Sequence, residues 1–166
     1  HGFNTPTDNS LARHRQLKAS LNASGFSGLV INFDWPSEAN VFAYAEDLED
    51  ATITSFRLLK DVLRPLYELS ADGRRFRLHL LGHSMGAFVI REAFRWAWES
   101  SVQKYQNVKV GQVCFIAADI SSQSMSSSRY DSAALYGSCA RVTNYYNRFD
   151  GVLQAANFLN PEKRRL

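Results

Sequence analysis

The chain of 166 residues has the composition of an ordinary globular protein, with 45% hydrophobic and 21% charged residues. That length builds one hydrophobic core and is too short for two ordinary domains, so we expect residues 1–166 to form a single domain or most of one. The net charge of +3 is small and the basic clusters lack interleaved aromatic residues, so nucleic acid is not an expected partner. No apolar run approaches the roughly 20 residues of a membrane span, so we expect no integral membrane segment.

The first expected elements are a helix and a strand. Asp8 or Asn9 is placed to cap a helix over Ser10–Ala23. The apolar run Gly28–Phe33 then has the pattern of a strand buried in a parallel sheet. Trp35 follows the end of this run, where open α/β sheets bind ligands, so it is a candidate to line a substrate pocket. Plain packing of its ring is the alternative.

The centre of the chain is the motif Gly82-His83-Ser84-Met85-Gly86, which follows a long helical stretch, Asn40–Leu69, divided by a proline. Phe76–Leu81 has a strand pattern and Ala87–Trp98 has apolar residues at helical spacing, so the motif falls on a strand-to-helix turn. Such a turn holds its serine in a strained backbone conformation that exposes the hydroxyl. The pattern predicts a nucleophile elbow with Ser84 as nucleophile, and its alternative is a glycine-rich turn with a passive serine.

Two more strands are expected after the elbow. Val110–Ala118 ends at Asp119, and a serine-rich loop over Ser121–Ser132 leads to the last strand, Ala140–Tyr146. A short helix follows, beginning next to Asp150. The alternation of helices and strands predicts an α/β fold with a doubly wound, mostly parallel sheet and flanking helices.

The cysteines and histidines indicate neither a disulfide framework nor a metal centre. Cys114 and Cys139 are expected to be buried thiols. The four histidines are scattered along the chain without the spacing of metal ligands. We therefore expect no metal and no cofactor.

The start of the chain predicts part of an oxyanion hole. In serine hydrolases a His-Gly pair turns the backbone so that the next amide N–H points toward the nucleophile. His1-Gly2 has this pattern, and the donor would be the amide of Phe3. A polar turn with no such role is the alternative.

Together these residues resemble the α/β-hydrolase fold and, more narrowly, a bacterial family of α/β hydrolases of unassigned function. The resemblance covers nearly the whole chain and implies Ser84 as nucleophile, the amides of Phe3 and Met85 as oxyanion hole, and Asp150 as the acid of a catalytic triad. The motifs that carry it are, in order, His1-Gly2-Phe3-Asn4, Phe33-x-Trp35-Pro36-Ser37, Asp47-x-Glu49-x-Ala51, Leu81-Gly82-His83-Ser84-Met85-Gly86, Ala117-Ala118-Asp119 and Tyr146-Asn147-x-x-Asp150.

The position of the histidines departs from this pattern. The triad order in the α/β-hydrolase fold is Ser, then Asp or Glu, then His. None of the four histidines follows Asp150; they are His1, His14, His79 and His83. We therefore expect residues 1–166 to be a partial domain, with the first strands and the last strand with its catalytic histidine outside this range.

Asp119 and Asp34 are rival acids because each also follows an expected strand. Asp119 leads into the serine-rich loop, which we expect to be mobile, whereas the helix that begins at Gly151 would hold Asp150 in place. A carboxylate that orients an imidazole needs a rigid mount. The sequence therefore favours Asp150 and keeps Asp119 as the alternative.

The predicted function is a serine acyl hydrolase, of carboxylesterase or lipase type, acting on a small-molecule acyl ester. Acyl transfer and thioesterase chemistry would use the same serine. An alternative of another class is a binding module that keeps the hydrolase fold without catalysis. The candidates to line a substrate pocket are Trp35, Phe88 and Phe149.

Overall fold

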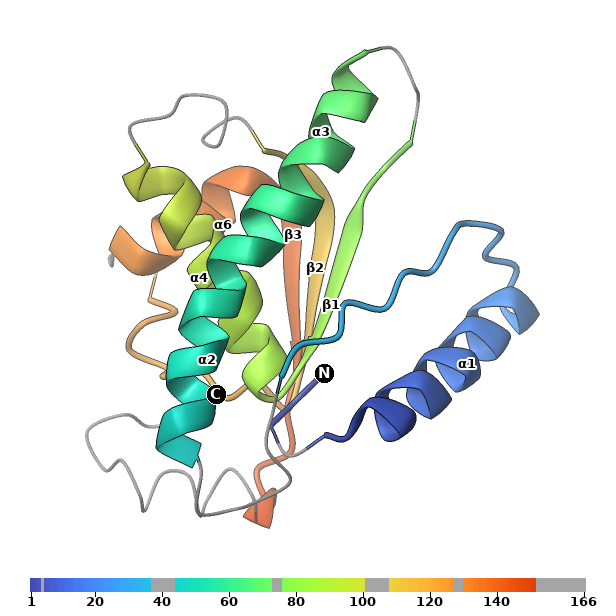
Figure 1. The fold of residues 1–166 in the computed structure, drawn as a ribbon, viewed down its shortest axis with the longest axis horizontal. Helices are drawn as coiled ribbons and strands as arrows, with labels where there is room; N and C mark the ends of the chain where they lie inside the picture. The colour runs from blue at the N-terminus through green and yellow to red at the C-terminus, as the bar shows by residue number, and fades with distance from the viewer. Residues whose placement is uncertain (4, 37–43, 73–75, 101–107, 127–129, 152–166) are drawn as a thin grey trace.

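The computed structural model describes residues 1–3, 5–36, 44–72, 76–100, 108–126 and 130–151. Figure 1 shows a parallel sheet flanked by helices. The elements in chain order are α1 (Thr7–Ala23), α2 (Tyr44–Arg57), the π-helical segment η2 (Leu58–Leu63), α3 (Arg64–Ala71), β1 (His79–His83), α4 (Met85–Glu99), β2 (Val110–Ile116), α6 (Tyr130–Ser138) and β3 (Cys139–Tyr145).

The described sheet has three parallel strands in the order β1-β2-β3, with β1 at one edge. In the register of the strands, His83 pairs with Ile116 and Ile116 pairs with Tyr145, so the three carboxyl ends are level. The residues that follow the strands, including Ser84, therefore gather at one edge of the sheet. The three strands expected from Phe76 onward are confirmed here, although β1 begins three residues after the predicted start at Phe76.

The strand predicted over Gly28–Phe33 is wrong for the described part of the chain, because these residues pair with no strand there. Leu29 is 80% exposed and Ile31 is 57% exposed, whereas a buried strand would cover both. Apolar composition favours a strand only when a neighbouring backbone supplies the ladder of hydrogen bonds. Within the described residues β1 pairs with β2 alone.

Helix α1 begins earlier than predicted and without the expected cap. Its N-cap is Pro6, with φ of −57°, and no side chain caps the helix. The proline ring holds φ near the helical value in place of a polar cap. The Thr7 hydroxyl instead donates to Asp34 Oδ2, 3.0 Å away. Figure 1 shows α1 set apart from the strands, on the side opposite the other helices.

The long helix before the elbow has a π-helical segment where the sequence predicts a break. The ring of Pro65 would clash with the carbonyl of Asp61 in a regular helix, and proline has no N–H to donate. The wider turn of η2 accommodates this misfit without ending the helix. Leu59 and Leu63 of this segment are fully buried, and η2 packs against α4.

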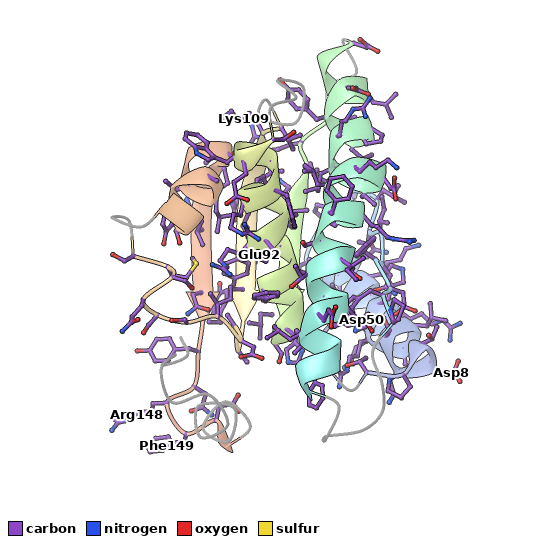
Figure 2. All side chains as sticks on the ribbon, turned by 60° about the vertical axis from the view of Figure 1, so that its left-hand side comes forward. Asp8, Asp50, Glu92, Lys109, Arg148 and Phe149 are labelled. Carbon is purple, nitrogen blue, oxygen red and sulfur yellow. The ribbon has the colours of Figure 1, made fainter. Side chains whose placement is uncertain are left out.

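Helix α4 carries both the core and a buried group of charges. Phe94 is almost fully buried, as the apolar spacing predicts. Arg91 and Glu92 are also buried and are paired with each other, and Glu92 contacts Arg95 at 2.6 Å. Figure 2 shows Glu92 on the inner part of the molecule. Two guanidinium groups thus compensate the charge of a buried carboxylate that would otherwise destabilise the fold.

Helix α6, Tyr130–Ser138, begins at the end of the predicted serine-rich loop and continues through residues for which the sequence analysis predicts no element. A parallel connection from β2 to β3 needs a crossover, and α6 supplies it. The residues before the helix are tied to their surroundings, since Ser124 Oγ donates to the Ser121 carbonyl at 2.8 Å and the Tyr136 hydroxyl donates to the Met125 carbonyl at 2.9 Å. These bonds argue against the predicted mobility for residues 121–126 of that loop.

Both cysteines are free and partly exposed, not fully buried as expected. In the register of β2 and β3, Cys139 pairs with Val110 and Cys114 with Thr143, so the cysteines are offset by four residues, about 13 Å along the strands. That separation excludes a disulfide between them. Burial raises the pKa of the Cys139 thiol.

We predict opposite effects of alanine at two glycines. A Cβ on Gly82 would lie 2.9 Å from the Cα and the N of Ala87, backbone atoms that cannot turn away. Gly82→Ala should therefore lower the free energy of unfolding by about 1–3 kcal/mol. A Cβ on Gly137, in α6, meets nothing within 4 Å, so Gly137→Ala should raise it by up to about 1 kcal/mol. Urea unfolding measures both, and equal effects would contradict the close packing of α4 on β1.

Candidate active site

Ser84 lies between the end of β1 and the start of α4, with φ of 52° and ψ of −123°. A positive φ is rare for a residue other than glycine and costs on the order of 1–3 kcal/mol. Hydrogen bonds on both sides hold this conformation. The Ser84 N–H donates to the Ile116 carbonyl at 3.0 Å, and the Ser84 carbonyl accepts from the N–H groups of Ala87 and Asp119. The strand-turn-helix predicted around Ser84 is confirmed.

The glycines around Ser84 allow the start of the chain to pack onto the elbow. A Cβ on Gly86 would lie 2.4 Å from the His1 carbonyl oxygen. A Cβ on Gly2 would lie 2.9 Å from Ser84 Cβ and 3.1 Å from His83 Nδ1. Neither glycine has room for a side chain, so the backbone of His1-Gly2 is in direct contact with the turn that carries Ser84.

The side chain of His1 is buried, with 4% exposed, and is held by residues from the end of the segment after α1. Its Nε2 lies 2.9 Å from Asp34 Oδ1 and 3.2 Å from the amide N of Trp35. Its ring stacks on the Trp35 ring, with centroids 5.2 Å apart and planes 3° from parallel. Figure 1 shows the start of the chain, marked N, and this segment coming together beside the carboxyl end of β1.

These contacts change the roles expected for Asp34 and Trp35. The Asp34 carboxylate accepts a hydrogen bond from Thr7 and pairs with His1, so both of its oxygens are engaged away from the role of a triad acid. Trp35 is buried, and its Nε1–H donates to the His1 carbonyl at 3.3 Å. Trp35 therefore packs against His1, which is the alternative interpretation, rather than forming the wall of a pocket. The sequence motif Asp-Trp-Pro was visible, but nothing local linked it to a histidine 33 residues earlier.

The two expected oxyanion donors come from two segments, the start of the chain and the start of α4. Phe3 follows Gly2 directly and packs against the hydrophobic core. Met85 is fully buried and is the first residue of α4. The first N–H groups of a helix have no partner within the helix, and they favour negative charge. The amide of Met85 is thus of the kind that can bind an oxyanion.

Both carboxylates considered as the acid lie at the edge of the sheet that carries Ser84. The Asp119 N–H donates to the Ser84 carbonyl at 3.1 Å, and the residue is 6% exposed. Asp150 is partly buried in a turn after β3, where its N–H donates to the Asn147 carbonyl at 3.0 Å. Burial lowers the pKa of the His83 imidazole, which is next to Ser84 in the chain, and the charge of Asp150 opposes this shift.

An open hollow of about 410 Å³ lies at the carboxyl ends of β2 and β3. None of the three pocket candidates lines it. Phe88 packs against the core under the guanidinium of Arg91, and Phe149 is 74% exposed and lies beyond the strand ends in Figure 2. The sequence missed the lining residues, although the rule that ligands bind at strand carboxyl ends points to them. They are Ile116, Ala117, Asn144, Tyr145, Tyr146 and Asn147.

The described residues contain no group of three or more side chains that could hold a metal ion. In the same part of the chain, no helix combines the length and the apolar character of a membrane span.

We predict that glycine at position 84 stabilises the fold more than alanine does. Both substitutions remove the hydroxyl, but only glycine relieves the strain of the positive φ. Ser84→Gly should exceed Ser84→Ala by about 1–2 kcal/mol in free energy of unfolding, measured in urea. Ala93→Gly, a control in the regular backbone of α4, should be destabilising. A Ser84→Gly variant less stable than Ser84→Ala would show that the turn is unstrained.

His83 should make stability depend on pH. Burial is the main cause that lowers the pKa of His83 below 6.5, Arg13 adds to it and Asp150 opposes it. On acidification the unfolded chain therefore takes up a proton before the folded one does. The contribution of His83 to the free energy of unfolding is complete above pH 6.5 and is lost as the pH falls toward the pKa that His83 has in the folded protein.

The test is urea unfolding at about pH 7.5 and about pH 5. The wild type should lose more free energy of unfolding on acidification than His83→Gln does. His79→Gln, at an exposed position on the same strand, is the matched control and should behave as the wild type. Equal losses in the wild type and His83→Gln would contradict the prediction.

Comparison with protein families matches residues 1–166 to the family described as "Alpha/beta hydrolase of unknown function (DUF900)". Comparisons with curated proteins and with solved structures give no match. The match covers the whole chain and agrees with the parallel sheet, the flanking helices and the strand-turn-helix at Ser84. The chain belongs to the DUF900 family of α/β hydrolases.

Proposed function

We propose that the protein is a serine hydrolase that cleaves the ester bond of a small acyl ester, with Ser84 as nucleophile. The observation that carries this proposal is the strained backbone of Ser84 at the carboxyl edge of the sheet, with the His1-Gly2 backbone packed directly on it. Strain at a single serine between a strand and a helix is a cost that a passive turn does not need. Membership of an α/β-hydrolase family supports hydrolysis as the reaction class.

In the proposed reaction, Ser84 Oγ attacks the acyl carbonyl carbon while an imidazole takes the hydroxyl proton. The amides of Phe3 and Met85 donate to the oxyanion of the tetrahedral intermediate. Its collapse breaks the ester bond, and the imidazole returns the proton to the leaving alcohol. Water then attacks the acyl-Ser84 ester, with the same imidazole as base, and releases the acid.

We propose that this imidazole comes from outside residues 1–166. His1 is engaged by Asp34 and Trp35, and His79 is at the opposite end of β1 from Ser84. The ring of His83 lies against Gly2, and His14 is on α1, which is set apart from the sheet. These positions favour an additional histidine as the general base.

Asp150 is the proposed acid, and Asp119 is the alternative. The turn that carries Asp150 is held by hydrogen bonds from the N–H groups of Asp150 and Phe149 to Asn147. Asp119 is 6% exposed, and its backbone N–H donates to the Ser84 carbonyl, so it lies near the elbow and stays the alternative. An orienting carboxylate must reach the imidazole as well as stay in place.

The test uses the full-length protein with a fluorophosphonate probe and p-nitrophenyl butyrate. We expect the probe to label Ser84, identified by peptide mass spectrometry, and Ser84→Ala to lose both labelling and turnover. Asp150→Asn should lower kcat on the order of 10³-fold or more, because it disturbs the orientation and the charge of the imidazole. Asp119→Asn should have a far smaller effect.

The reverse order of the two Asp variants would assign the acid to Asp119. If the wild type shows no labelling and no turnover, the binding module is favoured over the enzyme. Transfer of the acyl group to an added alcohol or thiol, in preference to water, would favour an acyltransferase that uses the same Ser84.

A further inference from the structure

The contacts around His1 form a chain that ends at the nucleophile. Its Nδ1–H donates to the Gly2 carbonyl at 2.9 Å, which sets the tautomer of the ring. In the neutral imidazole, Nε2 accepts from the Trp35 N–H, and in the imidazolium Nε2–H donates to Asp34. The ring is therefore held in either protonation state. The stacked Trp35 ring adds a third constraint, on the plane of the imidazole.

The backbone of His1 is held as firmly as its side chain. Its carbonyl accepts from Trp35 Nε1–H and lies where a Cβ on Gly86 would be, so it has no freedom to shift toward α4. Gly2, the next residue, packs so closely on Ser84 that a Cβ on the glycine would collide with Ser84 Cβ. Phe3 is the next residue, and its amide direction is set by the same backbone.

From these contacts we propose that Asp34, assisted by Trp35, is a positioning residue for the oxyanion hole. Through His1 and Gly2 the pair fixes the direction of the Phe3 amide relative to Ser84 Oγ. Asp34 itself does not touch the substrate. This inference rests on the proposed function, because the Phe3 amide acts only if an oxyanion forms at Ser84.

Misdirecting one oxyanion donor has a recognisable kinetic effect. The donor binds the oxyanion more strongly than it binds the ground-state carbonyl, so its loss lowers kcat and leaves KM almost unchanged. Removing a donor outright typically costs about 10²–10³-fold in kcat. A donor that is misaligned but present should cost about 10–100-fold.

The experiment measures kcat and KM for p-nitrophenyl butyrate with the full-length protein. Asp34→Ala should lower kcat about 10–100-fold with KM changed less than about threefold. Asp34→Asn should retain most of the activity, because its amide oxygen accepts from Nε2–H of the imidazolium and its amide N–H donates to Nε2 of the neutral ring. Asp8→Ala, which removes an exposed carboxylate from the first turn of α1, is the matched control and should match the wild type. Thermal unfolding of each variant confirms that it is folded.

Trp35→Phe keeps the stacked ring but loses the bond to the His1 carbonyl, and it decides the case if Asp34→Ala does not fold. It should lower kcat several-fold at constant KM. If Asp34→Ala folds and its kcat is unchanged, the positioning role is overturned. If only Trp35→Phe folds, an unchanged kcat of that variant overturns it. A loss in Asp34→Asn as large as in Asp34→Ala also overturns it, because the carboxylate charge would then be what matters.

The same measurements separate this inference from the proposed function. If Ser84 of the wild type reacts with the fluorophosphonate while the folded Asp34→Ala and Trp35→Phe variants both equal the wild type, only the positioning role fails. If the wild type neither reacts nor turns over ester, the proposed function fails and the inference fails with it.

Discussion

The direct contact between the His1-Gly2 backbone and the turn at Ser84 is the constraint on which the candidate site depends. Each side contributes a glycine where a Cβ would collide with the other: Gly86 against His1, and Gly2 against Ser84. Close packing of two backbones leaves little freedom for either. The relative position of the start of the chain and the Ser84 turn is therefore set by steric exclusion as well as by hydrogen bonds.

The parallel sheet places the other candidate groups at the same edge as this contact. All three strands end at one level, so the elbow, the open hollow at the ends of β2 and β3 and both candidate acids share one edge of the molecule. The strain at Ser84 is offset by backbone hydrogen bonds to Ile116, Ala87 and Asp119, which belong to β2, α4 and the segment after β2. The surrounding fold thus over-determines the conformation, as a strained functional residue requires.

The choice of acid shows how local and tertiary arguments can differ. The sequence predicts that Asp119 is held in place less firmly than Asp150, because a serine-rich segment follows it. In the structure that segment is tied down by Ser121, Ser124 and Met125 and leads into α6, so mobility no longer argues against Asp119. The preference for Asp150 now depends on the turn that carries it, which is held by hydrogen bonds from the N–H groups of Asp150 and Phe149 to Asn147.

The amino-acid sequence by itself determined the strand-turn-helix at Ser84, the presence of the strands β1, β2 and β3 along the chain and the α/β class, because glycine spacing and apolar periodicity are signals within a few residues. It did not reveal α6, whose serine-rich start resembles a loop, and it predicted a strand over Gly28–Phe33 that pairs with none among the described residues. Only the tertiary structure decided that His1 lies between Asp34 and Trp35, and that its backbone packs on Gly86. Those contacts join residues more than 30 positions apart, and no local pattern records which distant side chains the folded backbone brings together.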